Sequence, residues 1–411
     1  MRPLRPADIL IPQNVDMSAW SVVACDQFTS EPEYWQEVEK LVGDKPSALR
    51  MILPEAYLGK KDAGAESRIS AAMKKYLKDV IFAAYENSYV YVERTLAGGK
   101  LRRGFIGALD LEEYDYSPDS SSPIRATEGT VEDRLPPRVK VRMSAELEMP
   151  HIMVFIDDPG DTVMKAAAGG RELYNFDLMQ NGGHIAGFLA PDNAAVDAAV
   201  DALSQPEILD KKYGKTGKAP VIFAMGDGNH SLAAAKKCWE QIKPTLSEIE
   251  RENHPARFAL AEIVNIHDEA ISFEPIHKVL FNTSITRDFI PAGKMYFKGT
   301  EGFGHVVRFI SGDKSESISV KGLTIGELID SCERFISRYQ VLNGGRLDYI
   351  HGDAEAAKMA SGENCCGILL PKMSKDELFS SVIKSGPFPK KSFSIGVGPD
   401  KRYYLECRKI K

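Results

Sequence analysis

The chain has 411 residues, which is long enough for two or three packed domains or for one large α/β body with insertions. Hydrophobic residues make up 43% of the sequence and charged residues 27%, a composition that excludes general disorder. The 58 acidic residues outnumber the 52 basic ones and no long block of one sign forms a tail, so a dedicated binder of duplex DNA is disfavoured.

The cysteines and the first residues of the chain bear on its compartment. The six cysteines include no C-x-x-C pair, and Cys365 and Cys366 are adjacent, which is a poor geometry for a structural bridge. Pro3 and Pro6 stand where a signal peptide has its apolar stretch, and no apolar run approaches the roughly 20 residues that span a bilayer. We therefore expect a reduced, cytoplasmic protein that is neither exported nor embedded in a membrane.

Strand-like and helix-like segments alternate in the first part of the chain. Residues 114–123 are polar and rich in proline, so we interpret them as an exposed loop between strands of one sheet. Residues 25–32 follow a strand-like run, where α/β proteins place functional side chains, but Cys25 is better explained as a buried structural cysteine than as a nucleophile. Strands are predicted at 21–24, 89–93, 105–109 and 151–156, and a helix at 66–85.

The same alternation continues to the end of the chain. Residues 274–277 are interpreted as a loop leading into a helix. Buried strands are predicted at 220–225, 258–266 and 367–370, and helices at 193–209, 324–338 and 374–384. The fold class is therefore α/β, of the mixed α+β kind. We expect one large unit over residues 1–411, with a possible subdivision into 1–270, which holds a strand-turn-helix at 219–243, and 271–411.

That strand-turn-helix is the most informative stretch of the sequence. A buried strand ends in Gly226-Asp227-Gly228 and opens at once into an alanine-rich helix, which brings free backbone N–H groups and the positive end of the helix dipole to one point. Asn229, His230 and Ser231 can add donors, and Asp227 can hold a metal ion or accept a proton. The competing interpretation is a tight turn with a capped helix, since the pattern lacks the lysine of a P-loop and a full G-x-G-x-x-G.

Three segments resemble one family. Residues 227–234 are similar to the D-G-H-H-R-x-x-A signature of the bacterial and archaeal family called domain of unknown function 1015. Residues 125–134 are similar to its H-E-x-T-x-x-x-x-x-D-R segment, and residues 387–392 to its carboxy-terminal M-P-x-K-S motif. The resemblance runs from Arg2 to Ser392, so it covers most of the chain.

The resemblance carries further implications. That family is itself similar to the ParB and sulfiredoxin superfamily, which includes free serine kinases and binds nucleotide phosphates at a turn before a helix. The resemblance therefore implies a ParB/sulfiredoxin-like core elaborated with additional mixed sheet and helices, and a nucleotide or phosphorylated-metabolite site at residues 227–231. Ser231 stands where the superfamily usually has arginine, so the turn lacks a guanidinium and another basic residue must supply the charge, or the ligand differs.

Two other polar segments are candidates for the same site. The loop at 386–392 offers two ammonium groups and a hydroxyl, or is a solvated basic loop. The segment 125–134 offers arginines for phosphate and carboxylates for Mg²⁺ or for base catalysis, or is a surface loop of weak ion pairs. The candidates for binding phosphate or nucleotide are Gly228, Asn229, His230, Ser231, Arg125, Thr130, Arg134, Lys390, Lys391 and Ser392. The catalytic candidates are Asp227, His230 and Glu128, and the metal candidates are Asp227 and Glu132.

Two classes of function fit these features. The first is a phosphotransferase that uses ATP or ADP with Mg²⁺ on a small polar metabolite, with a phosphate-ester hydrolase as a variant. The second is a nucleotide-sensing protein that binds at the same turn without chemistry. In both cases the partner is a nucleotide or a small phosphorylated molecule, with membrane and nucleic acid disfavoured. The sequence indicates neither the acceptor nor the oligomeric state.

Overall fold

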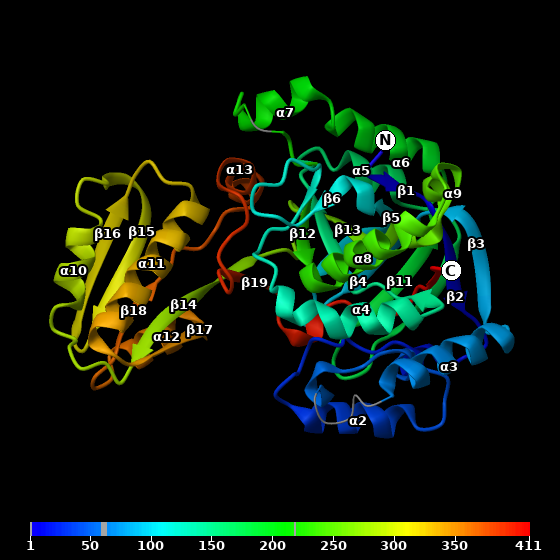
Figure 1. Ribbon diagram of the computed structural model, residues 1–411, viewed down its shortest axis with the longest axis horizontal. Helices are drawn as coiled ribbons and strands as arrows, with labels where there is room; N and C mark the ends of the chain where they lie inside the picture. The colour runs from blue at the N-terminus through cyan, green and yellow to red at the C-terminus, as the bar shows by residue number, and fades with distance from the viewer. Residues whose placement is uncertain (1, 59–63, 218) are drawn as a thin grey trace.

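The computed structural model describes residues 2–58, 64–217 and 219–411 and has two lobes (Figure 1). The larger lobe contains a mixed sheet with the strand order β10-β11-β4-β5-β13-β9-β12-β7-β6 and β1 beside β5. Its strands are β1 (Leu4–Arg5), β4 (Val90–Thr95), β5 (Leu101–Asp110), β6 (Tyr114–Asp115), β7 (Ile124–Arg125), β9 (Met153–Ile156), β10 (Glu172–Asp177), β11 (His184–Leu189), β12 (Phe223–Asp227) and β13 (Phe258–Asn265).

The smaller lobe contains a second sheet, with the order β16-β15-β18-β14-β17 and β19 beside β14. Its strands are β14 (Phe273–Phe281), β15 (Glu301–Ser311), β16 (Lys314–Val320), β17 (Arg346–His351), β18 (Cys366–Leu369) and β19 (Phe393–Ile395). Two ribbons complete the strands: β2 (Ala7–Pro12) with β3 (Phe82–Ser88), and β8 (Leu147–Glu148) with β20 (Arg408–Lys409).

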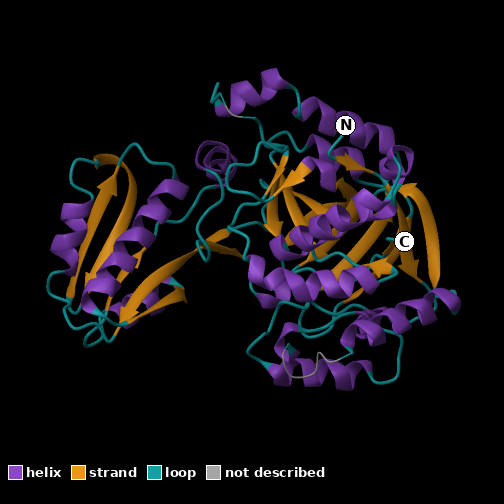
Figure 2. Ribbon diagram, viewed as in Figure 1, coloured by secondary structure: helices purple, strands orange, loops and turns teal. Residues whose placement is uncertain are grey.

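Helices cover these sheets (Figure 2). They are α1 (Met17–Trp20), α2 (Pro32–Val42), α3 (Ala65–Lys78), α4 (Leu135–Ser144), α5 (Thr162–Ala167), α6 (Asn193–Leu203), α7 (Pro206–Tyr213), α8 (Asn229–Ile242), α9 (Glu248–Asn253), α10 (Phe289–Tyr296), α11 (Ile325–Asn343), α12 (Asp353–Ala360) and α13 (Lys375–Ser385). The structure confirms the predicted mixed α/β class. The subdivision near residue 270 stays a prediction. Among the described residues, no helix is both long and apolar enough to span a bilayer.

The centre of the larger sheet explains why the site lies where it does. All residues of β13 are buried, because the strand lies between β5 and β9 and is covered on both faces. Its neighbour β9 runs parallel to it and antiparallel to β12, so the end of β12 lies beside the start of β9. Helix α8 follows β12 directly and packs along α4 (Figure 1).

Several predicted elements were wrong in extent or type. Residues 21–24 form only an isolated bridge, between Val23 and Tyr403, rather than a strand. The helix at 66–85 ends at Lys78, because Val80 has a positive φ of 53° and residues from Phe82 pair with β2. The helix at 193–209 breaks after Leu203, and Pro206 starts α7 as its first residue. Residues 274–277 are part of β14 rather than a loop before a helix, since long-range pairing with β17 and β19 fixes them as a strand.

Candidate functional site

The turn between β12 and α8 is tight and requires a glycine at residue 228. Gly228 has a φ of 81°, and a Cβ at this position would meet the Cα of Ile152 at 3.0 Å, so both conformation and space call for glycine. The Gly228 N–H donates to Asp227 Oδ1 at 2.9 Å. The first residues of α8 therefore present the positive end of the helix dipole beside the end of β12.

Both of the other polar segments lie against this turn. Thr127 Oγ1 donates to the carbonyl of Met225 in β12 at 2.7 Å, which holds the 125–134 segment beside the strand. Phe388 N–H donates to the carbonyl of Thr127 at 2.7 Å, and Lys391 N–H donates to Glu128 Oε1 at 2.5 Å. Segments more than 250 residues apart in the sequence are thus joined by backbone hydrogen bonds.

Two carboxylates lie close together in the site. Burial raises the pKa of Glu128, and the charge of Asp227 raises it further, although the N–H groups of Lys391 and Ser392 oppose the rise. Asp227 Oδ2 forms an ion pair with Lys401 Nζ at 3.1 Å. The Asp227 and Glu128 side chains therefore form a partly compensated acidic pair.

Cationic side chains converge on His230. Its Nε2 accepts a hydrogen bond from the N–H of Val131 at 3.3 Å, so this nitrogen carries no proton. Burial, together with the charges of Arg138 and Arg134, lowers the pKa of His230 to about 4, and Lys390 lowers it further while Asp26 opposes them. His230 is therefore neutral at pH 7 in an electropositive environment.

Asp26 is a site residue that the sequence analysis did not single out. Burial opposes its ionisation, but His151, a hydrogen bond from Gln27 and the charges of Lys401 and Arg138 lower its pKa overall. It is therefore an ionised carboxylate surrounded by cationic and hydrogen-bonding groups. Its position after the strand-like 21–24 run was the available signal. Burial raises the pKa of the neighbouring Cys25 thiol to about 11, so this thiol is protonated at neutral pH.

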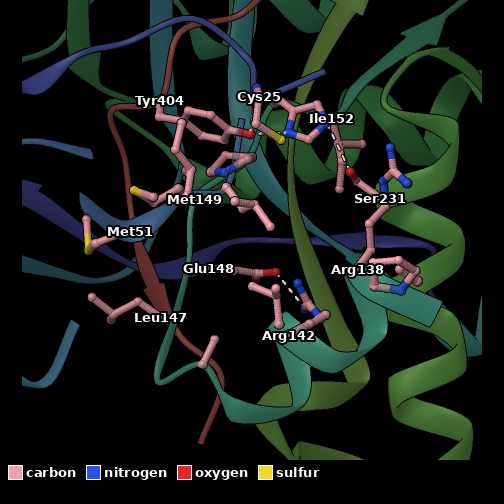
Figure 3. Close-up of a pocket in the computed structure, with 18 of the residues that line it drawn as sticks. Cys25, Met51, Arg138, Arg142, Leu147, Glu148, Met149, Ile152, Ser231 and Tyr404 are labelled. Atoms are coloured by element: carbon pink, nitrogen blue, oxygen red, sulfur yellow. Dashed lines mark hydrogen bonds and ion pairs between the residues drawn. The ribbon is translucent and has the colours of Figure 1, made fainter. Parts of the chain in front are cut away.

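Ser231, at the start of α8, begins a chain of hydrogen-bonding side chains that reaches Tyr404 and Cys25 (Figure 3). Ser231 Oγ lies 3.0 Å from His151 Nε2, and the hydroxyl of Tyr404 lies 2.8 Å from His151 Nδ1. The Tyr404 hydroxyl also accepts the N–H of Cys25 at 3.2 Å. His151 and Tyr404 had no local motif that could have revealed them.

Lys401 and Tyr404 both come to the candidate site from the C-terminal segment of the chain. Arg94 donates to the carbonyl of Pro399 at 2.5 Å, and Arg102 donates to that of Asp400 at 2.8 Å. These buried guanidinium groups fix the backbone next to Lys401. Residues far from the site in sequence thus set the position of a cation beside Asp227.

Several predicted site residues point elsewhere. The Arg125 guanidinium donates to the carbonyls of Ser122 and Ala219, which indicates a structural role rather than the expected contact with phosphate. Glu132 pairs with Lys237 at 2.9 Å, with 68% of its side chain exposed, and so does not join Asp227 as a metal ligand.

In the loop at 386–392, two of the three predicted side chains contact other groups of the protein and one acts on His230. The ammonium group of Lys391 lies 4.8 Å from the centre of the Tyr349 ring, and the hydroxyl of Ser392 donates to the carbonyl of Pro389 at 2.6 Å. Lys390 is the residue of this loop whose charge reaches His230. The side chains of Lys391 and Ser392 are thus occupied within the protein.

Two oxygen atoms at the turn are buried without a hydrogen-bond partner. They are Oδ1 of Asn229 and Oγ1 of Thr130. Buried polar atoms are normally paired, and an unpaired one costs stability. Both residues were predicted to contact a ligand, which stays a prediction.

The chain is similar to one protein family and, distantly, to several solved structures. A family model described as "Protein of unknown function (DUF1015)" matches residues 4–364, and no curated protein matches the chain. A solved structure of free serine kinase in complex with AMP has a TM-score of 0.36 and 11% identity, covering 74% of this chain and 91% of the kinase. A conserved hypothetical protein from Pyrococcus furiosus has a TM-score of 0.34 and 12% identity, covering 74% of this chain and 94% of that one. C-terminally truncated SbnI from Staphylococcus aureus has a TM-score of 0.36 and 10% identity, covering 71% of this chain and 82% of SbnI.

Proposed function

The chain belongs to the family described as protein of unknown function DUF1015, and we propose that it is a nucleotide-dependent phosphotransferase acting on the hydroxyl group of a small metabolite. The proposed phosphate site is the turn from Gly228 to Ser231. The proposed acceptor hydroxyl lies between this turn and Asp26.

The observation that carries the proposal is the charge around His230. Arg134, Arg138 and Lys390 act on a histidine that stays neutral, and all of them surround the N-terminal end of a helix. A helix N-terminus and cationic side chains stabilise the same kind of ligand, a polyanion. Arg134 and Lys390, which form no ion pair among the described residues, are the cations that would offset the charge that develops in phosphoryl transfer, whereas Arg138 is paired with Glu55.

The carboxylates divide into two roles in this proposal. Asp26 is ionised in the free protein and accepts the proton of the acceptor hydroxyl. Asp227 and Glu128 are close enough for one charge to raise the pKa of the other, which is the arrangement that a cation relieves. Lys401 holds Asp227 in place through its ion pair.

The acidic pair fits a Mg²⁺ ion that accompanies a nucleotide. Mg²⁺ is commonly held by one or two carboxylates, with phosphate and water completing its shell, so Asp227 and Glu128 suffice as protein ligands. Within the part of the chain that the structure describes, no group of three or more His, Cys, Asp and Glu side chains is placed to hold a metal ion. When bound, the ion neutralises phosphate charge.

The test combines binding with turnover. The full chain is titrated calorimetrically with ADP and ATP in the presence of Mg²⁺, and phosphorus NMR follows ATP in a pool of small hydroxylated acceptors. We expect Asp26→Asn to lower turnover by roughly 10²- to 10⁴-fold while nucleotide affinity is kept, because the variant loses a proton acceptor. The matched control is Asp330→Asn, which removes an exposed carboxylate from α11.

Two results would overturn the proposal. The absence of nucleotide binding by the folded wild-type protein would remove the phosphate site. Full turnover by a folded Asp26→Asn variant would remove the role of Asp26. Tight binding without turnover across the acceptor pool would favour the nucleotide-sensing alternative.

A further inference from the structure

A largely apolar cavity opens beside the first turn of α8, where Ser231 and Ala234 are among its lining residues. Its volume is about 170 Å³. Helices α3, α4 and α8 and the segments around residues 51–58 and 147–152 form its wall. Most of the lining is hydrocarbon or thioether, contributed by Met51, Ile52, Leu53, Leu58, Met73, Pro137, Val141, Ala145, Leu147, Met149, Pro150, Ile152, Ala234 and Leu260.

Polar groups gather where this cavity meets the proposed phosphate site. Ser231, His151 and Tyr404 line it on one side, and Arg138 lines it on the side of α4 (Figure 3). Arg138 is also one of the cations whose charge lowers the pKa of His230. The cavity and the cationic cluster therefore share a boundary.

The Ser231 hydroxyl is suited to meet a ligand at this boundary. A serine hydroxyl can donate one hydrogen bond and accept two, and its contact with His151 uses one of these. His151 is in turn oriented by Tyr404, which the N–H of Cys25 holds in place. A hydroxyl at the cavity mouth thus meets an oriented Ser-His pair, while the rest of the ligand lies among apolar side chains.

The size of the cavity limits the ligand. An engineered apolar cavity of about 150 Å³ in another protein stays dry and binds benzene. The volume here is similar, and three lining methionines, Met51, Met73 and Met149, can adapt their shape to an irregular group. The cavity therefore matches a hydrocarbon group about as large as benzene. The charged side chains that also line it are paired with one another, Arg138 with Glu55 and Arg142 with Glu148.

We infer that this cavity binds the hydrocarbon part of the acceptor, so that the substrate class is a small alcohol with an apolar group of about benzene's size. This inference rests on the proposed phosphotransferase function for the identity of the ligand as acceptor. Ser231 and His151 position the hydroxyl at the mouth of the cavity, and the apolar wall selects against acceptors that are polar throughout.

The inference is tested on the full chain with straight-chain primary alcohols from propanol to hexanol. Methyl-labelled methionine NMR reads out the site, because Met51, Met73 and Met149 line the cavity while Met295 is exposed on α10. We expect the three lining methyl signals to shift, with affinity rising about fourfold for each added methylene until the cavity is full. Glycerol, as the polar comparison, leaves these signals unchanged.

Variants that fill the cavity provide the second arm. Ala234→Leu on α8 and Val141→Phe on α4 each place carbon atoms into it, and we expect either one to weaken hexanol binding by at least about tenfold. Ala198→Leu, on the exposed face of α6, is the matched control and keeps the wild-type hexanol affinity. Two cavity variants are used so that a folding failure in one leaves the other informative.

The results separate this inference from the proposed function. Unshifted lining signals, an affinity independent of chain length, or unchanged hexanol binding in a folded cavity variant would overturn the inference. The affinity for ADP with Mg²⁺, measured on the same samples, tests the nucleotide site independently. ADP binding without alcohol binding would overturn only the inference about the cavity. Alcohol binding without ADP binding would overturn only the proposed nucleotide site.

Discussion

Two clusters of charge in the larger lobe are built on opposite principles. The first is a buried network in which Glu262 pairs with Arg402 at 2.7 Å and with Arg102 at 3.6 Å, and Arg402 also pairs with Glu406. Glu262 is 1% exposed and Arg402 is 4% exposed. Each carboxylate of this network faces a guanidinium inside the protein, so the network is completed without a ligand.

The second cluster surrounds the start of α8 and is balanced only in part, because Arg138 forms an ion pair with Glu55 whereas Arg134 and Lys390 are exposed and have no carboxylate partner among the ion pairs of the described residues. Arg134, Arg138 and Lys390 bear on a neutral His230, and Asp26 is the carboxylate that opposes them there. This cluster lies at a helix end and borders a cavity. A high density of charge therefore occurs in a scaffold as well as in a candidate site, and the two clusters differ in whether every charge has a partner within the protein.

Removing one member of the balanced network is expected to have the largest effect on stability. Glu262→Gln leaves buried guanidinium groups without their counter-charge, and breaking a buried pair costs about 3–5 kcal/mol. Urea denaturation measures the free energy of unfolding. The control is Glu37→Gln, an exposed member of a surface pair, for which the change stays below about 1 kcal/mol. A loss at Glu262 no larger than that of the control would show that the network is not structural.

The partly balanced cluster should show the reverse behaviour. Lys390→Met removes an exposed cation that faces the proposed phosphate site, so stability is kept while nucleotide affinity falls by about 10- to 100-fold, the usual worth of a charged hydrogen bond. Calorimetry with ADP measures the affinity. Lys358→Met on α12 removes the same charge elsewhere and leaves affinity within about twofold. Equal affinities for the two variants would exclude Lys390 from the site.

The sequence could predict the part of the site that is local. The turn at Gly226–Ser231 followed from a buried strand, glycines and an amphipathic helix that are contiguous in the chain. Glu128 and Lys390 were candidates because they lie in segments that resemble a family, and their roles stay predictions. His151, Lys401 and Tyr404 could not be predicted, because pairing between distant segments and the carbonyl contacts of Arg94 and Arg102 bring them to the site.

The same limit explains the errors in the fold. Residues 274–277 contain a proline and a histidine and have no strong alternation, so their strand conformation comes from neighbours on β17 and β19. Arg125 and Glu132 looked equivalent in sequence to Glu128. Their actual partners, two carbonyls and Lys237, are set by how the segment folds against β12 and α8.

The pH dependence of stability tests the cluster at the start of α8, because it reports on one neutral residue, His230. The pKa of His230 in the folded protein is about 4, below the ordinary value of about 6.5, so the unfolded state binds more protons between these values. The stabilisation is complete above pH 6.5 and is lost as the pH falls toward 4. We expect the wild type to lose about 1–2 kcal/mol more than His230→Gln over this range, once solvent screening is allowed for.

Binding of a polyanion should raise the lowered pKa of His230. NMR of the His230 ring follows its pKa directly, and inorganic tripolyphosphate is the probe. Bound anion offsets Arg134, Arg138 and Lys390, so the pKa of His230 moves up toward its ordinary value. An unchanged pKa with saturating tripolyphosphate would mean that these cations do not face an anion site.

The smallest loss of stability is expected at Thr130, which lies three residues from Thr127. Thr127 Oγ1 donates to the carbonyl of Met225, whereas Thr130 Oγ1 is buried without a partner. Thr127→Val should therefore cost about 1–3 kcal/mol, whereas Thr130→Val should leave the free energy of unfolding unchanged or raise it, since it removes a buried hydroxyl that has no partner. Urea denaturation of both variants gives this difference. If the Thr130 hydroxyl forms a hydrogen bond with a bound ligand, Thr130→Val weakens ADP binding. Thr127→Val then weakens ADP binding only to the extent that it unfolds the protein. A cost at Thr130 equal to that at Thr127 would show that this hydroxyl has a protein partner and belongs to the scaffold.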